Sequence, residues 1–291
     1  MTAFWNKTVL KSLAPALAAL GLIVAAQPAA AEGKGGPLHP HNPGFSFEGP
    51  FGTFDQGQLQ RGYKVYREVC AACHSMSLLS FRTLGEKHGP FWDPHYPNPN
   101  DNPYVKALAA EVQVADIDSE TGEPLQRPAT TADRFPSPYP NATAAAAANG
   151  GAAPPDLSVM AKARHSGASY IYSLLTGYRN PPANLQIRQG QYYNAYMPGD
   201  LTPFVPEGAK VPPGGFIAMP PPLRANQVTY DDGTAATVEQ MSKDVAAFIA
   251  WGTEPRQIER KQTGFGVLIF LVLFAGLTYL SYRRIWRNVA H

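Results

Sequence analysis

The sequence has very few cysteines. Cys70 and Cys73 are the only two among 291 residues. Because both belong to one short motif, no disulfide framework can be inferred and a four-cysteine zinc site is excluded. Charged residues are also sparse, at 16% of the chain, and the formal net charge is only +2. Proteins that bind nucleic acid usually carry a strongly basic surface, so no nucleic-acid partner is expected.

The N-terminal segment lacks arginine, which a mitochondrial presequence would contain in abundance. Lys7 and Lys11 instead precede an apolar run over residues 12–26, and three small residues, 29–31, form a cleavage pattern. The alternative is a retained anchor helix, but the apolar run is short for a membrane span. We therefore predict that residues 1–31 are a bacterial export signal.

One long stretch near the C-terminus lacks charge altogether. Residues 263–282 would extend about 30 Å as a helix, which matches the hydrocarbon thickness of a bilayer. Basic residues flank both ends, so the positive-inside rule does not decide the orientation. The export signal does, and it predicts a periplasmic domain (32–262), a single span of the bacterial inner membrane, and a cytoplasmic tail (283–291).

The two cysteines lie in the sequence CAACH, residues 70–74. Cys-x-x-Cys-His is the pattern that attaches a c-type haem, because two thiols on one helical turn reach the two vinyl groups of one porphyrin. His74 then presents its imidazole to the iron. A thioredoxin-like pair would need an α/β context, whereas helix and loop flank this motif. The sequence therefore predicts one covalently bound haem c.

A sixth iron ligand must come from elsewhere in the chain. Met76 follows the histidine too closely to reach the opposite haem face, and Met160 and Met241 lie within predicted helices, where core packing is the ordinary role. Met197 and Met219 lie in Pro-bracketed loops. Met219 is the better candidate, since the following prolines stiffen its loop. His/Met ligation leaves no open site, so we expect electron transfer without bond chemistry.

Hydrophobic spacing predicts a mostly α-helical domain. Helices are expected over residues 57–69, over 168–176 and from Thr237 to Gly252. Asp156 is expected to cap a short helix that ends near Arg164. Arg164 is a candidate partner for a haem propionate, although it could equally be a solvated side chain. Frequent Gly and Pro predict loops elsewhere, over residues 90–103, 124–155 and 178–235.

Six stretches together resemble the cytochrome c1 family, the haem subunits of ubiquinol–cytochrome c oxidoreductase (bc1) complexes. They are RGYKVYREVCAACHSM, PPDLSVMAKARH, YIYSLLTGY, IAMPPPL, DDGTAAT and KDVAAFIAWGTEP. The resemblance covers roughly residues 45–290. It implies a cytochrome c-like haem domain with long loop insertions on one C-terminal transmembrane helix. It also implies an electron path from the Rieske iron–sulfur protein, beside a cytochrome b subunit, through this haem to a soluble cytochrome c.

The same resemblance implies roles for individual residues. Cys70 and Cys73 would form the thioether bonds, His74 and Met219 would ligate iron, and Arg164 would bind a propionate. Further haem-pocket residues would be Asn149, Pro155, Tyr170, Leu174 and Ile217. Some bacterial members carry an additional cysteine pair that this chain does not have, so loop 178–216 must be held by other contacts.

Four other functions are alternatives to this one. A membrane-tethered cytochrome c shuttle would need a flexible low-complexity tether, which the short segment before the span does not supply. A cytochrome subunit of a terminal oxidase is a further alternative of the same class. A haem peroxidase would need an open iron coordination site, and a purely structural anchor would not need the haem motif.

Charge is distributed unevenly along the chain. Residues 32–262 contain 19 basic and 22 acidic residues, a formal net charge of −3. Five acidic residues without an intervening Lys or Arg gather within residues 111–123: Glu111, Asp116, Asp118, Glu120 and Glu123. Opposite charges steer association between proteins. From composition alone this run could be a solvated acidic loop without a role. The family resemblance implies instead an acidic surface that docks the basic face of a soluble cytochrome c.

Overall fold

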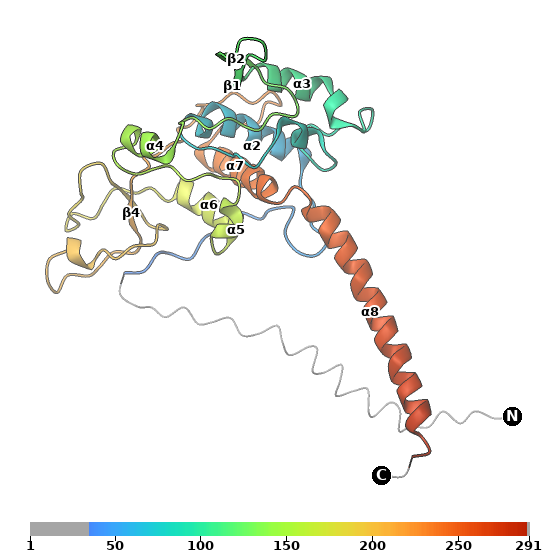
Figure 1. The fold of residues 1–291 in the computed structure, drawn as a ribbon. Coiled ribbons are helices and arrows are strands. Elements are labelled where there is room, and N and C mark those ends of the chain that lie inside the picture. The colour runs from blue at the N-terminus through green and yellow to red at the C-terminus, as the bar shows by residue number, and fades with distance from the viewer. Residues whose placement is uncertain (1–34, 290–291) are drawn as a thin grey trace. The chain divides into compact units, whose positions relative to one another are not determined.

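The structure, a computed structural model, describes residues 35–289, so the predicted export signal lies outside the described residues (Figure 1). The α-helices are α2 (Gln56–Glu68), α3 (Pro103–Ala110), α4 (Ala142–Ala148), α5 (Met160–Ala163), α6 (Gly167–Thr176), α7 (Val238–Thr253) and α8 (Gln257–Trp286). Two antiparallel pairs of short strands are formed by β1 (Gln113–Ile117) with β2 (Pro124–Pro128), and by β3 (Tyr192–Asn194) with β4 (Gly215–Ile217). Short 3-10 turns are η1 (Cys70–Ala72), η2 (Phe81–Gly85), η3 (Pro99–Asp101) and η4 (Thr202–Phe204). The prediction of a mostly helical domain with one long C-terminal helix is confirmed.

The core of the domain forms where α2 packs against α7 (Figure 1). Asp55 begins α2, since its side chain accepts a hydrogen bond from the backbone N–H of Gln58 at 2.6 Å. Gly62 lets the two helices approach closely, because a Cβ atom there would lie 2.2 Å from the carbonyl oxygen of Asp244 in α7. Around this contact Tyr63 and Phe248 pack edge to face, with ring centroids 5.6 Å apart.

The three long helices predicted within the domain are confirmed. Thr237 caps α7 by accepting a hydrogen bond from Gln240 at 3.1 Å, as its sequence pattern predicts. The last residue of α7 is Thr253, one beyond the predicted Gly252. Gly177 ends α6, and its backbone N–H donates to the carbonyl of Leu174.

The predicted loop over residues 124–155 is wrong in part, whereas residues 90–103 form a loop apart from η3, and α3 begins at the last of them. Asn102 caps the unexpected α3 and accepts hydrogen bonds from Tyr104 and Val105, while Pro103 occupies its first turn. The strand β2 lies at the start of the second predicted loop and pairs with β1 in a hairpin. Asn141 caps α4, a run rich in alanine. In each case a local cap or a cross-strand partner outweighs the Pro- and Ala-rich composition.

The segment 178–216 is held without a disulfide. β3 pairs with β4, and Leu185, Tyr193 and Leu201 form a small hydrophobic cluster apart from the main core. The Tyr193 hydroxyl donates to the carbonyl of Pro213 at 2.6 Å. These contacts hold this segment in place.

The final helix, α8, contains the whole predicted span and extends beyond it at both ends. Among the described residues of α8, only Ile258 is buried. Its most apolar window has a mean hydropathy of 2.1 and is not covered by the rest of the domain. α8 is therefore long enough and apolar enough to anchor the chain in a membrane.

Candidate functional site

The cysteine motif follows directly from the end of α2. The chain turns through η1, where the backbone N–H groups of Cys73 and His74 donate to the carbonyl of Cys70 at 3.1 and 2.9 Å. This tight turn brings the two thiols and the imidazole together at one end of the α2–α7 pair. Both cysteines are free of disulfides, and burial raises the pKa of the Cys70 thiol to about 12.

His74 is oriented by a distant backbone carbonyl. Its Nδ1 lies 2.8 Å from the carbonyl oxygen of Pro155. A carbonyl only accepts, so Nδ1 must carry the proton and Nε2 keeps a free lone pair. Burial lowers the pKa of His74, although the bond to Pro155 and the charge of Asp156 partly oppose this. The imidazole is therefore neutral at pH 7, the form that binds a metal.

Asp156, which follows Pro155, connects this part of the chain to residues 75–77, which follow His74. Its carboxylate accepts hydrogen bonds from the hydroxyls of Ser75 and Ser77, each at 2.7 Å, and from the backbone N–H of Ser77 at 3.0 Å and of Ser158 at 2.7 Å. Burial raises the pKa of Asp156, but these hydrogen bonds outweigh it and hold the pKa well below its ordinary value.

The expectation that Asp156 caps a helix is wrong. α5 begins after Val159 and has no side-chain cap. Asp156 lies four residues before the first residue of α5, and its carboxylate accepts instead from Ser75, Ser77 and the nearby Ser158.

The methionines fall into two groups. The side chains of Met76 and Met241 are fully buried in the main core, and Met160 packs against it. Met197 and Met219 are half-buried loop residues that belong to neither hydrophobic cluster. The two candidates that sequence reasoning kept for the sixth ligand are therefore the two that core packing does not occupy.

Tyrosine hydroxyls hold both loop methionines in place. Tyr178 donates to the carbonyl of Met219 at 3.0 Å, which holds the main chain and leaves the sulfur unused. Tyr170 instead donates to the sulfur of Met197 at 3.9 Å. This difference favours Met219 over Met197 as a ligand, because only the Met197 sulfur is already a hydrogen-bond acceptor.

The remaining predicted pocket residues lie on α6 and β4 and directly after α4 and α5. Tyr170 and Leu174 are on α6 and Ile217 is on β4, and all three are absent from both hydrophobic clusters of the described residues. Arg164 is exposed and donates to the carbonyl of Ala163 at 3.2 Å. It also lies close to the Tyr170 hydroxyl. Burial raises the pKa of Tyr170, and the neighbouring charge of Arg164 partly lowers it again. Asn149, at the end of α4, donates to the carbonyl of Ala145 at 2.7 Å.

Sequence reasoning missed several residues that position this site. Asn194 is fully buried, and its amide donates to the carbonyl of Leu174 at 2.8 Å. Tyr178 forms an isolated bridge with Asn194 and holds the Met219 loop. Both lie at the ends of Gly- and Pro-rich segments without periodicity, so no local signal identifies them.

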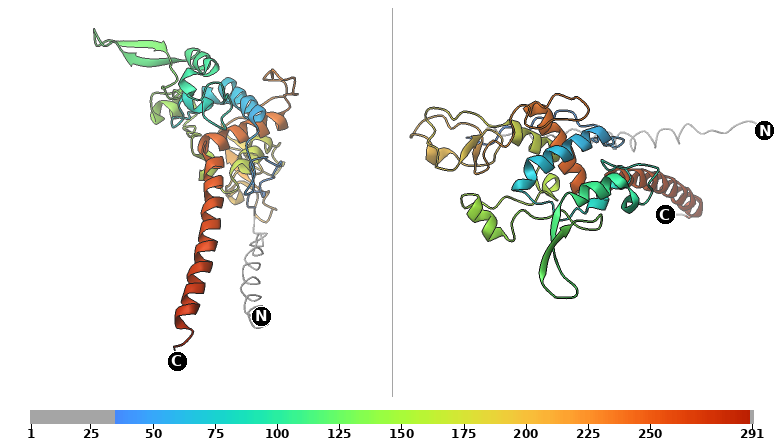
Figure 2. Two further views of the ribbon diagram at one scale, coloured as in Figure 1. Left: turned by 90° about the vertical axis from the view of Figure 1, so that its right-hand side faces the viewer. Right: turned by 90° about the horizontal axis from the view of Figure 1, so that it is seen from above.

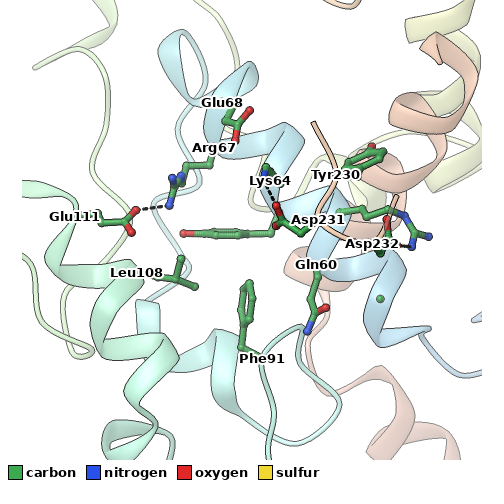
Figure 3. A pocket seen from close by; sticks show the side chains of 13 residues that line it. Gln60, Lys64, Arg67, Glu68, Phe91, Leu108, Glu111, Tyr230, Asp231 and Asp232 are labelled. Carbon is green, nitrogen blue, oxygen red and sulfur yellow. Dashed lines mark hydrogen bonds and ion pairs between the residues drawn. The ribbon is translucent and has the colours of Figure 1, made fainter. Parts of the chain in front are cut away.

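A groove elsewhere on the domain is not part of this site. About 530 Å³ in volume, it runs along α2 and is lined by residues of α2 and α3 and of the loop before α7 (Figure 3). Its charges pair with one another, as Arg67 does with Glu111 and Lys64 does with Asp231. None of the predicted haem residues lines it, and its paired charges fit a solvated surface.

Comparison with known proteins assigns the family. The model of the cytochrome C1 family matches residues 45–289, which is most of the chain. The chain belongs to the cytochrome c1 family.

Relatives of this family cover most of the chain. Cytochrome c1 of Rhodospirillum rubrum is 40% identical, over 95% of this chain and 97% of the relative. A mitochondrial cytochrome c1 heme protein of Arabidopsis thaliana is 45% identical over 82% of this chain and 69% of the relative. A cytochrome b/c1 of Bradyrhizobium diazoefficiens is 41% identical over 95% of this chain, but the alignment spans only 40% of that relative's length.

The site residues fit the haem that this family's proteins carry. Two unpaired thiols and a histidine with a free Nε2 lie on one turn, and a loop methionine with an unused sulfur is available. Within residues 35–289, no three His, Cys, Asp or Glu side chains gather closely enough to hold a metal ion directly. Two thiols, an imidazole and a thioether are the donors that attach and ligate a c-type haem.

Proposed function

We propose that this chain carries one covalent haem c and relays single electrons. Cys70 and Cys73 form the thioether bonds, and His74 and Met219 are the axial ligands. The haem, when bound, supplies the one-electron redox chemistry. The observation that carries this proposal is the hydrogen bond between Pro155 and His74 Nδ1, which presents Nε2 as a ligand directly beside the two thiols.

The pocket residues would have separate tasks. Arg164 provides a positive charge for a propionate, and Tyr170, Leu174 and Ile217 provide apolar contacts that exclude water. Asn149 and Pro155 hold the backbone around the site, through the contacts to Ala145 and His74 described above. A water-poor, rigid pocket keeps reorganisation small when an electron enters or leaves.

We further propose that the chain is the cytochrome c1 subunit of a quinol–cytochrome c oxidoreductase complex. It receives electrons from the Rieske iron–sulfur protein, lies beside a cytochrome b subunit, and passes electrons to a soluble cytochrome c. The Bradyrhizobium relative, named cytochrome b/c1, supports the pairing with cytochrome b.

The connection to the membrane helix favours this role over that of a tethered shuttle. Only residues 254–256 separate α7 from α8. Glu254 pairs with Arg260 on α8 and also with Lys162 at 3.4 Å. A short junction that is held by ion pairs keeps the domain close to the membrane, whereas a shuttle needs a long flexible tether.

The bacterial inner membrane is the proposed location, with residues 32–262 on the periplasmic side. Membrane anchoring by α8 and the bacterial relatives support this location. The export signal over residues 1–31 is proposed from its sequence pattern alone.

Two matched methionine variants test the haem ligation. Met219→Leu should keep the covalent haem but lower its reduction potential markedly, because a thioether favours ferrous iron. Met197→Leu is the control, a half-buried loop methionine of the same kind, and should leave the potential close to wild type. Redox titration of the purified membrane protein decides. A lowered potential in Met197→Leu together with an unchanged one in Met219→Leu would reverse the assignment.

Isolation of the native complex tests the assembly. A tag at the C-terminus should recover a cytochrome b and an iron–sulfur protein together with this chain, identified by mass spectrometry. Recovery with the subunits of a terminal oxidase instead would contradict the proposed complex while leaving the haem assignment intact.

An acidic surface is the proposed docking site for the soluble cytochrome c. The β1–β2 hairpin, which carries most of the acidic run, projects from the domain (Figure 2). Asp116 is paired with Arg127, and Asp118 accepts backbone hydrogen bonds from Glu120 and Thr121 within the turn. The unpaired acidic side chains of this hairpin are therefore fewer than the sequence suggests.

The salt dependence of electron transfer tests this surface. Glu120→Gln with Glu123→Gln should flatten the fall of the bimolecular rate with ionic strength, because opposite charges steer association. Glu68→Gln with Glu207→Gln removes the same charge elsewhere and should change the slope less. Equal slopes in the two variants would place the docking charges outside the hairpin.

A further inference from the structure

The loop of residues 46–53 is closed tightly and anchored in the domain. The backbone N–H of Thr53 donates to the carbonyl of Ser46 at 3.0 Å. At Gly52 a Cβ atom would lie 1.9 Å from the carbonyl oxygen of Glu48, so no other residue fits this turn. Phe47 is buried and stacks on Phe54 with ring centroids 4.5 Å apart. The base of the loop is therefore rigid.

Phe51, in the second half of this loop, points away from the core. Its side chain is 77% exposed within the described chain, although Phe45 and Phe47 of the same segment are buried. Its ring meets the ring of Phe265 on α8 edge to face, with centroids 5.6 Å apart. A large apolar side chain thus lies against the anchor helix rather than against the domain.

Lys261 fastens the loop to α8. Its ammonium group donates to the carbonyl oxygens of Phe47 at 2.6 Å and Gly52 at 3.2 Å. Lys261 lies one turn before Phe265 on the helix, so the two residues hold successive parts of the loop. The loop therefore follows α8 to whatever depth the helix takes in the bilayer.

The depth of Phe51 follows from the position of Phe265. Phe265 is the third residue of the uncharged span 263–282, about 3 Å beyond its start at 1.5 Å per residue. Lipid that surrounds Phe265 must therefore also reach the Phe51 ring, which Phe265 contacts. Aromatic rings prefer this boundary, and a lysine beside it keeps its charge at the headgroups.

We propose that residues 46–53 form a second membrane contact, in which Phe51 enters the boundary between headgroups and acyl chains of the phospholipid bilayer. One helix alone would let the domain turn about the helix axis. A second contact at a fixed position beside the helix restricts that rotation. The haem domain would then keep one face toward its membrane partners.

Site-specific photocrosslinking tests this contact in the intact membrane. Phe51 is replaced by p-benzoyl-phenylalanine in the full-length chain, which is irradiated in cell membranes after haem staining confirms a loaded protein. The same substitution at Phe270, 62% exposed within the span, is the lipid-facing control. The same substitution at Tyr104, 67% exposed on α3, is the solvent-facing control.

The outcomes separate three surroundings of Phe51. We expect phospholipid adducts at Phe51 at a yield comparable with Phe270 and at least about tenfold above Tyr104, since interfacial aromatic groups contact acyl chains. Adducts to another protein chain would show that a subunit, not lipid, covers the loop and would overturn the proposal. A yield as low as at Tyr104 would place Phe51 in water and overturn it as well.

Discussion

The close approach of α2 and α7 makes Gly62→Ala a sharp test of the core. The added Cβ would lie 2.2 Å from the carbonyl oxygen of Asp244 and 2.7 Å from Cβ of Phe248. Ordinary contacts begin near 3.4 Å, so the two helices must separate by about 1 Å. The first obstacle is backbone, which cannot rotate aside as a side chain can.

The size of the effect follows from what surrounds the contact. Phe248, Val65 and Trp251 have no exposed surface, so separation of the helices opens voids in a packed core. It also lengthens the ion pair between Arg61 and the fully buried Asp244, which is 3.0 Å in the native protein. Overpacking costs about 1–3 kcal/mol and a weakened buried pair adds to it, so we expect a loss of about 3 kcal/mol in the free energy of unfolding.

Gly57→Ala is the matched control in the same helix. A Cβ at position 57 would meet Asp55 at 3.6 Å and Arg61 at 3.7 Å, both ordinary contacts. Its stability should equal or exceed that of wild type by up to about 1 kcal/mol, because alanine favours a helix more than glycine does. Denaturant titration of the haem-loaded proteins, followed by far-ultraviolet circular dichroism, measures both. Equal stabilities of the two variants would refute the helix-contact argument.

Three further predictions concern the site and the anchor. Cys70→Ser combined with Cys73→Ser should yield protein without a haem-stained band on denaturing gels, since no other cysteine exists. Asp156→Asn should lower the free energy of unfolding by about 2 kcal/mol at pH 7, because hydrogen bonds to a charged group contribute about that much. The pKa of Asp156 is lower in the folded protein than in the unfolded chain, where it is about 4. The stabilisation is therefore complete above about pH 4 and is lost as the pH falls through the pKa of the folded protein. Thermal melts of variant and wild type should accordingly converge in strong acid. Protease added to intact spheroplasts should digest the haem domain and spare a tag after residues 283–291; the opposite pattern would reverse the orientation.

Features that depend on neighbours in the chain could be predicted from the sequence. The CAACH motif, the capped start of α7 and the uncharged span all lie within one or a few helical turns, where residue types determine geometry directly. The missed α3 also has a local signal, Asn102 followed by Pro103, which the surrounding Pro- and Asn-rich composition obscures.

The predicted haem-attachment motif and the uncharged span can be recognised in the sequence alone, because each consists of contiguous residues. The contacts that hold the proposed site, in contrast, exist only in the folded chain. Pro155 meets His74 across 81 residues, and Tyr178 meets Met219 across 41. Phe51 reaches the membrane helix only because the domain folds back on it. Such contacts depend on how packed helices and loops converge in space, and no periodicity or local propensity encodes a hydrogen bond between residues so far apart.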